Sequence, residues 1–278
     1  GGVLQHIEEA GIHSGDSACV LPPYRITTEA LDKIIQITIA IALELPVVGL
    51  INLQFAYKDE QVFVLEVNPR ASRTVPFVSK ATNIPLARIA AKLATGIKLK
   101  DMDLKQWDEI SHIAVKEAVL PFNKFPSESI FLSPEMKSTG EVMGISDTFG
   151  QSFRRASISA GNIIYDSGTV FISVNDADKM NVIPLARDLS EIGFRIVATL
   201  GTAKEFKRNG IPVESIFKVG EGRPNAVDGI KNGEIQLVIN TPMGKQSRYD
   251  EEAIGQACIQ KGIMAITTLS GAEAAVRA

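Results

Sequence analysis

The amino-acid sequence predicts an α/β protein whose second half forms a doubly wound, mostly parallel sheet. From Gly168 onward, short apolar runs alternate with amphipathic segments that end at or near a glycine. This alternation is typical of parallel strands joined by helices that cover both faces of a sheet. In the first half, longer strand-like runs are separated by loops that contain proline and charge, so we expect an α+β arrangement there.

The composition is that of an ordinary globular protein. The chain has 278 residues, of which 45% are hydrophobic and 22% charged, and its formal net charge is −3. This length suits about two domains, and the acidic balance argues against a nucleic-acid-binding surface. The longest apolar run, at residues 34–50, contains polar residues and a proline, so we expect no membrane span and a cytoplasmic location. Cys19 and Cys258 belong to no CxxC motif and are expected to be buried, reduced thiols.

Three helices and one hairpin are expected in the first half. The helices are predicted at residues 31–45, 76–82 and 85–95, and the hairpin strands at residues 47–57 and 62–67. Thr27 can cap the first helix, and Pro46 ends it. Pro76 and Pro85 each occupy the first turn of a short helix, a position that tolerates the missing N–H.

The second half contains five predicted strands and five predicted helices. The strands span residues 169–174, 195–199, 212–216, 235–240 and 263–266, and the helices span residues 177–192, 202–209, 225–232, 250–260 and 271–277. The segment 150–168 is rich in Ser, Asn and Gly and is interpreted as a connection between the halves. This interpretation divides the chain into domains at residues 1–160 and 161–278.

The predicted hairpin collects oxygen-bearing side chains on one face. Strand residues alternate between faces, so Asn52 and Gln54 share a face of the first strand, and Glu66 and Asn68 share a face of the second. With a three-residue turn at residues 59–61, Gln54 lies opposite Glu66. Carboxylate and amide oxygens are suitable ligands for Mg²⁺, which commonly bridges nucleotide phosphates.

The surroundings of this hairpin indicate an anion site beside the metal site. Val62 and Val64 are expected on the face of Glu66 and indicate that this face is partly buried. Arg70 and Arg73 follow the second strand, and paired guanidinium groups suit a bicarbonate, carbamate or phosphate oxyanion. The alternative is a solvated hairpin face with surface arginines. The expected apolar face comprises Leu53, Phe55, Phe63, Leu65 and Val67.

Four motifs in the first half resemble those of the carbamoyl-phosphate synthetase large-subunit family, and they occur in the family's order. They span residues 13–18, 63–82, 116–122 and 138–144. The resemblance implies an ATP-grasp fold that uses ATP with Mg²⁺ or Mn²⁺. It implies metal ligation by Gln54, Glu66 and Asn68, the first two also contacting ATP, and oxyanion binding by Arg70 and Arg73. The implied nucleotide-contacting loop comprises Gly11, Ile12, His13 and Ser14.

In that family only the carbamate-phosphorylating half is followed by a regulatory domain, so the resemblance places this chain in that half. The other lobe of the ATP-grasp unit precedes the position of Gly1 in the family. We therefore expect a truncated or split chain that makes no carbamoyl phosphate alone. The implied partners are the rest of the large subunit and a glutaminase small subunit.

Polar residues in the second half predict an anion pocket. Thr199 and Thr202 lie between a predicted strand and helix, Lys218 and Asn240 follow or end other strands, and Lys179 opens a helix. Helix N-termini offer free N–H groups to an anion, and the carboxyl edge of a doubly wound sheet is where ligands bind. Ordinary capping and surface exposure would explain any one of these residues by itself.

The second half resembles the methylglyoxal-synthase-like domain that ends the same large subunit. The motifs are at residues 198–203, 221–224, 230–234 and 239–242. The resemblance implies an effector such as UMP or IMP, bound by the five residues of the predicted anion pocket. A further set matches an ornithine site: Glu8, Asp16, Glu117 and Thr267. The chain departs from the family at Ala265, where an aromatic is usual, and at Pro242 and Met243, where hydroxyls are usual.

Three other functions compete with a catalytic fragment. The first is a stand-alone nucleotide-binding regulatory module without catalysis. A true methylglyoxal synthase would need a catalytic histidine in the pocket, and none follows His112. Another ATP-grasp ligase, such as a biotin carboxylase, is disfavoured by the regulatory domain after the hairpin.

Overall fold

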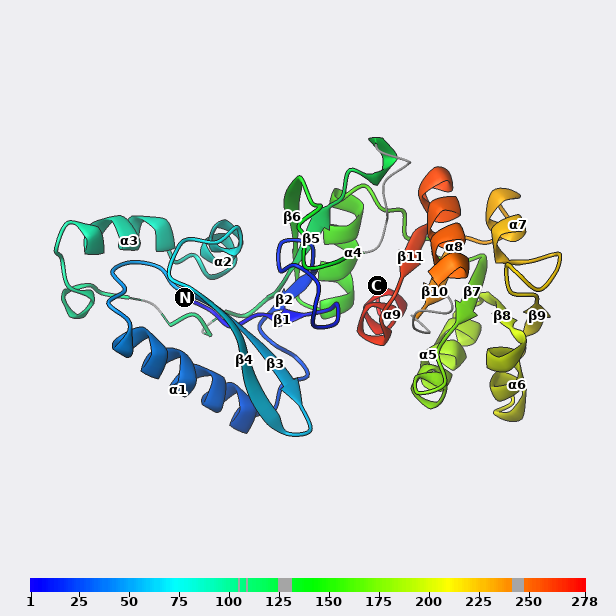
Figure 1. Cartoon of the computed structure of the whole chain (residues 1–278), viewed down its shortest axis with the longest axis horizontal. Helices are drawn as coiled ribbons and strands as arrows, with labels where there is room; N and C mark the ends of the chain where they lie inside the picture. The colour runs from blue at the N-terminus through cyan, green and yellow to red at the C-terminus, as the bar shows by residue number, and fades with distance from the viewer. Residues whose placement is uncertain (105, 109, 125–131, 242–247) are drawn as a thin grey trace. The chain divides into compact units, whose positions relative to one another are not determined.

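The computed structural model describes residues 1–104, 106–108, 110–124, 132–241 and 248–278 (Figure 1). The chain forms two compact units. Unit 1 comprises residues 1–6 and 19–114, and unit 2 comprises residues 7–18 and 115–278. The predicted domain boundary at residue 160 therefore lies inside unit 2 and not between the two units.

A helix occupies most of the segment that was predicted to connect the two halves, so that interpretation was wrong for residues 150–159. This helix, α4 (Phe149–Ser159), begins after Thr148, whose hydroxyl accepts a hydrogen bond from the backbone of Gln151. Phe149, Phe153 and Ala156 recur at helical spacing and are buried. The helix packs on strand β6 and on the C-terminal helix α9, which explains why residues before 160 share a core with the C-terminal part.

Unit 1 contains two pairs of antiparallel strands and several helices. Strand β1 (Gln5–His6) pairs with β2 (Cys19–Leu21), and β3 (Asn52–Lys58) pairs with β4 (Gln61–Asn68). The predicted helices are present as α1 (Thr28–Glu44), α2 (Thr74–Thr82) and α3 (Leu86–Ala94), followed by the short 3₁₀ helix η1 (Leu99–Asp101). Thr27 caps α1 as predicted, because its side chain accepts from Ala30 N–H at 3.2 Å.

The β3–β4 hairpin has the predicted cross-strand register but not the predicted turn. Gln54 lies opposite Glu66, and Asn52 lies opposite Asn68. The turn has two residues, Asp59 and Glu60, both with positive φ, and Lys58 pairs directly with Gln61; this backbone matches the twist of a hairpin. A β-bulge near Gln54 inserts one extra residue into β4 and restores the register that a three-residue turn would have produced.

Unit 2 is built on a five-stranded sheet in which every neighbouring pair is parallel. The strand order is β11-β10-β7-β8-β9, which confirms the predicted doubly wound sheet. The strands are β7 (Thr169–Ser173), β8 (Arg195–Thr199), β9 (Glu214–Ile216), β10 (Leu237–Asn240) and β11 (Met264–Ile266). The helices are α5 (Lys179–Glu191), α6 (Leu200–Arg208), α7 (Ala226–Lys231), α8 (Arg248–Lys261) and α9 (Leu269–Val276). Strands β5 (Ile113–Val119) and β6 (Gly140–Ser146) and the 3₁₀ helix η2 (Phe122–Lys124) precede α4.

Alternate residues of each strand pack against different helix layers. Val170 and Ile172 share a buried cluster with apolar residues of α5, α6 and α9. Phe171, between them in sequence, packs with residues of α7 and α8 on the other face. Both faces of the sheet are therefore covered, and the carboxyl edge is the place where ligands bind in sheets of this kind.

Unit 1 carries large apolar side chains at its surface. On α1 and the segment after it, the side chains of Leu43 and Val48 are 82% and 72% exposed, and Leu65 on the hairpin is 54% exposed. Among the described residues, no helix is both long and apolar enough to cross a membrane. Cys19 and Cys258 are free and buried, as predicted.

Gly150 provides a test of the packing between α4 and the C-terminus. A Cβ at Gly150 would clash with the Arg277 carbonyl oxygen, and a backbone atom cannot rotate away. We predict that Gly150→Ala lowers the free energy of unfolding by about 1–3 kcal/mol, measured by urea unfolding. Gly140→Ala is the matched control, because the nearest atom to its Cβ would be 4.0 Å away. Equal urea midpoints for the two variants would contradict this packing.

Candidate functional site

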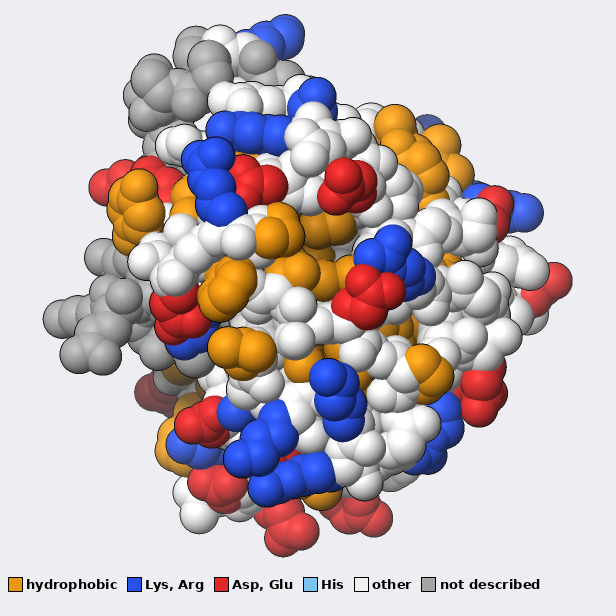
Figure 2. Space-filling view, turned by 90° about the vertical axis from the view of Figure 1, so that its right-hand side faces the viewer, with side chains coloured by type: hydrophobic (Ala, Val, Ile, Leu, Met, Phe, Trp, Pro, Cys, Tyr) orange, Lys and Arg blue, Asp and Glu red, His pale blue; other side chains and the backbone are white. Residues whose placement is uncertain are grey.

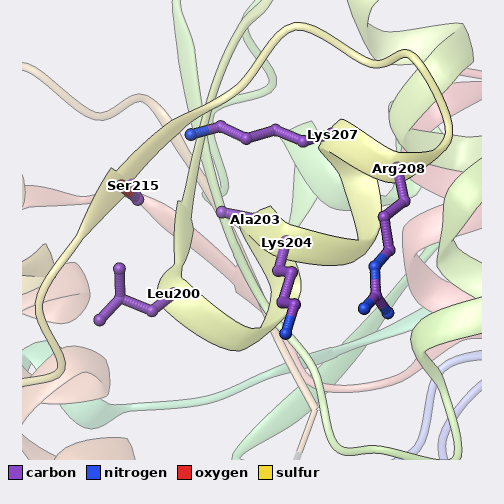
Figure 3. A pocket seen from close by; sticks show the side chains of 6 residues that line it. All are labelled: Leu200, Ala203, Lys204, Lys207, Arg208 and Ser215. Atoms are coloured by element: carbon purple, nitrogen blue, oxygen red, sulfur yellow. The ribbon is translucent and has the colours of Figure 1, made fainter.

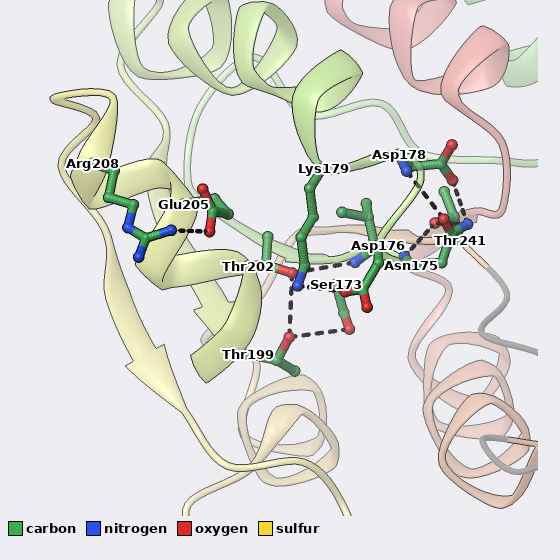
Figure 4. A network of polar contacts seen from close by, with 11 residues as sticks. Ser173, Asn175, Asp176, Asp178, Lys179, Thr199, Thr202, Glu205, Arg208 and Thr241 are labelled. Carbon is green, nitrogen blue, oxygen red and sulfur yellow. Dashed lines mark hydrogen bonds and ion pairs between the residues drawn. The ribbon is translucent and has the colours of Figure 1, made fainter.

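Three hydroxyl groups meet at the carboxyl ends of β7 and β8 in unit 2 (Figure 4). Ser173 ends β7 and Thr199 ends β8, and their hydroxyl oxygens are 3.3 Å apart. The Thr199 hydroxyl donates to the hydroxyl of Thr202, 3.4 Å away in the first turn of α6, and Val174 N–H donates to the same oxygen. All three hydroxyl residues are buried. These bonds fix the N-terminal end of α6, where free N–H groups favour an anion, against the sheet edge.

Lys179 brings an ammonium group to this helix terminus. It is the first residue of α5, and its Nζ lies 3.3 Å from the position that a Cβ on Gly201 would take. Because Gly201 has no side chain, the ammonium group can lie beside the first turn of α6. Lys179 Nζ also forms an ion pair of 2.6 Å with Asp176. A cation beside a helix N-terminus is electrostatically unfavourable by itself, so this arrangement requires nearby negative charge.

Lys218 lies on the loop after β9 and acts on the same carboxylate. The pKa of Asp176 is lowered first by its hydrogen bond and charge interaction with Lys179, and further by the positive charge of Lys218. Lys218 Nζ is 3.7 Å from the carboxylate of Glu221. The positive charges of both lysines predicted for the anion pocket therefore act on Asp176.

The end of β10 completes this edge of the sheet. Asn240 pairs in register with Ser173 of β7. The buried hydroxyl of Thr241 accepts hydrogen bonds from the backbone and the side-chain amide of Asn175, at 3.1 and 3.2 Å. The same amide donates to Asp178 at 2.6 Å. The strand order reverses between β7 and β10, which is the usual place for a ligand in such a sheet. The family departures at Pro242 and Met243 lie outside the described residues.

The structure thus places all five residues of the predicted pocket at one sheet edge and adds others that sequence reasoning missed. Ser173 carries the same signal as Asn240 and Thr241, which end the next predicted strand, and could have been found by it. Asp176 and Asn175 gave no comparable signal, because acidic and amide residues before a helix are usual caps.

A separate basic groove lies on a different face of α6 (Figure 3). It is a hollow of about 510 Å³ lined by Leu200, Ala203, Lys204, Lys207, Arg208 and Ser215. Arg208 is paired with Glu205 at 2.7 Å. The view of this side of unit 2 in Figure 2 shows Lys and Arg side chains among apolar ones. The groove is open and its lysines are exposed, whereas the hydroxyl cluster is buried and ordered by hydrogen bonds.

The hairpin of unit 1 presents one carboxylate and three amide groups on one face. The opposed pairs Gln54–Glu66 and Asn52–Asn68 put all four side chains on the same side. Among the described residues, no three His, Cys, Asp or Glu side chains are arranged to hold a metal ion. A divalent ion at the hairpin would therefore depend on Glu66 together with amide oxygens, which are suitable hard ligands.

The bulge corrects the predicted faces of the hairpin. Phe55 pairs with Val64, and Gln54 pairs with Glu66, so Val64 and Glu66 lie on opposite faces. Phe63, opposite Ala56, shares the face of Glu66 instead. The expected partial burial of that face is found at Asn52, Gln54 and Asn68, which are half-buried, whereas Glu66 is exposed and Phe63 is 47% exposed.

The two predicted oxyanion residues flank the start of α2. Arg73 occupies the N-cap position of α2 and makes no side-chain cap hydrogen bond. Arg70 is exposed and donates to the carbonyl of Ala71 at 3.0 Å. Positive side chains next to a helix N-terminus create a local positive potential that suits an anionic ligand.

Hydrogen bonds within unit 2 fix the backbone of the predicted nucleotide loop, Gly11 to Ser14. His13 N–H donates to the carbonyl of Ser133 at 2.8 Å. The buried ammonium group of Lys116 donates to the Ser14 carbonyl at 3.0 Å and lies 3.8 Å from Glu141. Gly11 has a φ of 103°, a conformation that favours glycine. Lys116 was not predicted as a site residue, although it belongs to one of the family-like motifs.

Asp16 differs from the other residues of the predicted ornithine-like site, because its carboxylate is bonded to the backbone. The buried carboxylate of Asp16 accepts from the N–H groups of Lys137 and Ser138, at 2.7 and 2.9 Å. Both carboxylate oxygens of Asp16 therefore stabilise the fold by accepting backbone hydrogen bonds. The hydroxyl of the buried Thr268 donates to the carbonyl oxygen of Ile7 at 3.3 Å. This hydrogen bond brings Thr267, which precedes Thr268, close to Glu8, which follows Ile7. Glu117 is half-buried on β5.

Two domain models match the chain. The model described as "Carbamoyl-phosphate synthase L chain, ATP binding domain" matches residues 5–102, and the model described as "MGS-like domain" matches residues 181–267. The first range contains the hairpin and the nucleotide loop. The second contains Thr199, Thr202, Lys218 and Asn240 and begins two residues after Lys179.

Curated relatives are similar over nearly the entire chain. The carbamoyl phosphate synthase large chain of Acidobacterium capsulatum is 54% identical over 280 residues, covering 99% of this chain and 26% of that protein. The large chain of Archaeoglobus fulgidus is 54% identical over 279 residues, covering 100% and 26%. This chain is homologous to the C-terminal part of the carbamoyl phosphate synthase large chain. It spans about a quarter of the length of these family members.

The burial of Cys258 excludes a nucleophilic role for this thiol. Burial raises the pKa of Cys258 to about 12, so it is protonated near neutral pH, and the thiolate is the reactive form.

Asp16 provides a test of how the nucleotide loop is held. Asp16→Asn keeps the shape of the side chain but directs an amide N–H₂ group at one of the two backbone donors. We predict that this variant unfolds with a free energy lower by about 1–3 kcal/mol, since a buried donor loses its acceptor. Asp188→Asn, at an exposed position of α5, is the control. The prediction is wrong if the two variants share one urea midpoint.

Proposed function

We propose that the chain forms part of a carbamoyl phosphate synthase large chain, with an ATP-dependent carbamate-phosphorylating portion followed by an effector-binding domain. The observation that carries this proposal is 54% identity over 99% of the chain, together with both domain models in the family's order. The geometry of each unit supports a separate part of the proposal.

The hairpin face is proposed to bind Mg²⁺ or Mn²⁺ with ATP through Gln54, Glu66 and Asn68. A divalent ion bound there would neutralise charge on the ATP phosphates. Gly11, Ile12, His13 and Ser14 are proposed to contact the nucleotide. The half-exposed loop is suited to this role because hydrogen bonds from Lys116 and to Ser133 fix its backbone.

Arg70 and Arg73 are proposed to orient carbamate. Their guanidinium groups and the N-terminus of α2 provide positive charge for its carboxylate-like group. A carbamate oxygen would then attack the γ-phosphate of ATP in line, forming carbamoyl phosphate and ADP. Such phosphoryl transfer depends mainly on positioning and on electrostatic stabilisation of the transferring group.

The carboxyl edge of the parallel sheet is proposed to bind a phosphorylated effector such as UMP or IMP. Lys179, Lys218 and the N-terminus of α6 supply positive charge, and Thr199, Thr202 and Asn240 supply polar groups. Such an arrangement suits a phosphate group. An ornithine-like amine would rely on Glu8, Glu117 and Thr267, because Asp16 already accepts two backbone N–H groups.

The chain alone is proposed to bind effector without making carbamoyl phosphate, because it spans about a quarter of the large chains. A stand-alone regulatory module is the second candidate function, supported by the complete five-stranded sheet of unit 2. In the enzyme, the rest of the large chain and a glutaminase small subunit would be its cytoplasmic partners. Calorimetric titration with UMP and, separately, with Mg-ATP tests this assignment. UMP binding without carbamoyl phosphate synthesis is expected; synthesis by the purified chain would overturn it.

The pocket assignment is tested at Lys179. Lys179→Ala removes an ammonium group from the N-terminus of α6, and we predict UMP binding weaker by about tenfold or more, measured calorimetrically. Lys204→Ala, on the basic groove of α6, is the matched control and should bind UMP like the unchanged chain. Weaker UMP binding by Lys204→Ala, with unchanged binding by Lys179→Ala, would assign the site to that groove instead.

The metal assignment is tested at Glu66. Glu66→Gln removes the one carboxylate of the hairpin face, and we predict Mn²⁺ binding in the presence of ATP weaker by about tenfold, measured by paramagnetic resonance of free Mn²⁺. Glu60→Gln changes a carboxylate at the turn of the same hairpin and should have no effect. Equal Mn²⁺ binding by both variants would exclude Glu66 as a ligand.

A further inference from the structure

The basic groove of α6 lies between this helix and the edge of the parallel sheet. Strand β9 is the last strand in the sheet order, and Ser215 of β9 pairs in register with Ala198 of β8. Ala198 belongs to the buried cluster on the side of the sheet that α6 covers, so Ser215 lies on that side as well. The groove therefore has one wall from α6 and one from the outermost strand of the sheet.

Two of the three basic residues that line the groove are not neutralised by a neighbouring acid. Arg208 is paired with Glu205 at 2.7 Å. Within the described ranges of the chain, Lys204 and Lys207 form no ion pair, and both are exposed. Figure 3 shows their side chains leaving α6 in different directions. Two uncompensated positive charges therefore border the hollow at separate points.

The acidic residue of β9 does not change the charge of the groove. Glu214 precedes Ser215, so its side chain lies on the other face of the strand. Glu214 also forms an ion pair of 2.6 Å with Arg195 of β8. The groove is therefore locally positive in a chain whose formal net charge is −3.

Favourable helix ends explain only part of this arrangement. Lys207 and Arg208 lie in the last turn of α6, where cations interact favourably with the carbonyl end of a helix. Lys204 lies one turn earlier, and Leu200, at the start of the helix, is 56% exposed. Leu200 and Ala203 give the groove an apolar surface beside its cations. An apolar contact area with a charged rim is typical of a surface that binds another protein.

The shape of the groove favours a segment of a protein over a small molecule. A small ligand is normally enclosed over most of its surface, whereas this hollow of about 510 Å³ is open. A protein segment contacts a surface at several points along its length and needs no enclosure. The grooves of two copies of this chain would repel each other through their like charges, so the partner must carry the opposite charge.

We propose that the basic groove docks an extended acidic segment of a partner protein. Carboxylates of that segment would lie beside Lys204 and Lys207, and an apolar side chain between them would cover Leu200. These residues are separate from Lys179 and Lys218, so the inference goes beyond the proposed effector pocket and does not depend on it.

The electrostatic part is tested with a fluorescent synthetic peptide, a leucine flanked on each side by a short run of glutamates, whose anisotropy is measured with the whole chain at low salt. Lys204→Glu combined with Lys207→Glu should weaken peptide binding about tenfold or more, because two attractive charges become repulsive. The matched control combines Lys231→Glu with Lys261→Glu. It changes the net charge equally at the ends of α7 and α8, on the other face of the sheet, and should bind the peptide like the unchanged chain.

The apolar contact is tested separately at Leu200. Leu200→Ala removes exposed apolar atoms and should weaken binding of the leucine peptide about threefold. A second peptide, with serine in place of leucine, should bind Leu200→Ala and the unchanged chain equally. Equal weakening with both peptides would overturn the proposed docking mode.

Three further results would overturn the inference. The first is an absence of peptide binding to the unchanged chain up to about 1 mM. The second is an equal loss of binding in both double variants, which would indicate attraction by net charge alone. The third is binding of inorganic tripolyphosphate through Lys204 and Lys207 without binding of the peptide, which would make the groove a small-anion site.

Urea unfolding establishes that the variants are folded. If the double glutamate variant does not fold, Lys204→Gln combined with Lys207→Gln takes its place, because it removes both charges without adding negative ones. This variant should weaken peptide binding about threefold, and unchanged binding would contradict the docking site.

Discussion

The reversal of strand order between β7 and β10 is the constraint on which the proposed effector pocket depends. From β7 the chain adds β8 and β9 on one side, and it then returns to add β10 and β11 on the other side. The loops that leave β7 and β10 consequently diverge at the carboxyl edge of the sheet. Hydrogen bonds from Asn175 to Thr241 and between Ser173 and Thr199 hold these strand ends together. The polar groups there are ordered by the fold before any ligand binds.

The same sheet edge concentrates positive charge, and this charge has a structural consequence. Lys179 lies at the start of α5 and beside the start of α6, so two helix N-termini and an ammonium group share one place. Such a concentration is unfavourable unless an anion is near. In the structure Asp176 meets this need. The site proposed for a phosphate therefore already contains a carboxylate beside its lysine.

The sheet of unit 2 could be predicted because each local signal agreed with the tertiary structure. Apolar strands such as residues 169–173 are buried on both faces, and Gly193 and Gly210 end helices in the left-handed conformation. The hairpin was harder, because the bulge opposite Gln54 depends on pairing between strands. Helix α4 was missed because its serine and glycine residues made the segment resemble a loop, although its apolar residues recur at helical spacing. Asp176 was missed because an acidic residue just before a helix is usually only a cap.

Unit 1 shows what the pattern of a hairpin alone leaves open. The oxygen-bearing face of β3 and β4 was predicted from alternation, and its cross-strand pairs are present. The predicted partial burial of this face holds for Asn52, Gln54 and Asn68, whereas Glu66 and Phe63 are exposed. The exposure of Leu43, Val48 and Leu65 is more apolar surface than a solvated helix and hairpin usually carry.

Amide NMR during titration with UMP tests whether an anion binds at the N-terminus of α6 beside β7. We predict that the largest shifts of backbone N–H resonances fall on Gly201, Thr202 and Val174, at the hydroxyl cluster. Largest shifts at Lys207, Arg208 and Ser215, which line the basic groove of α6, would contradict binding at this cluster.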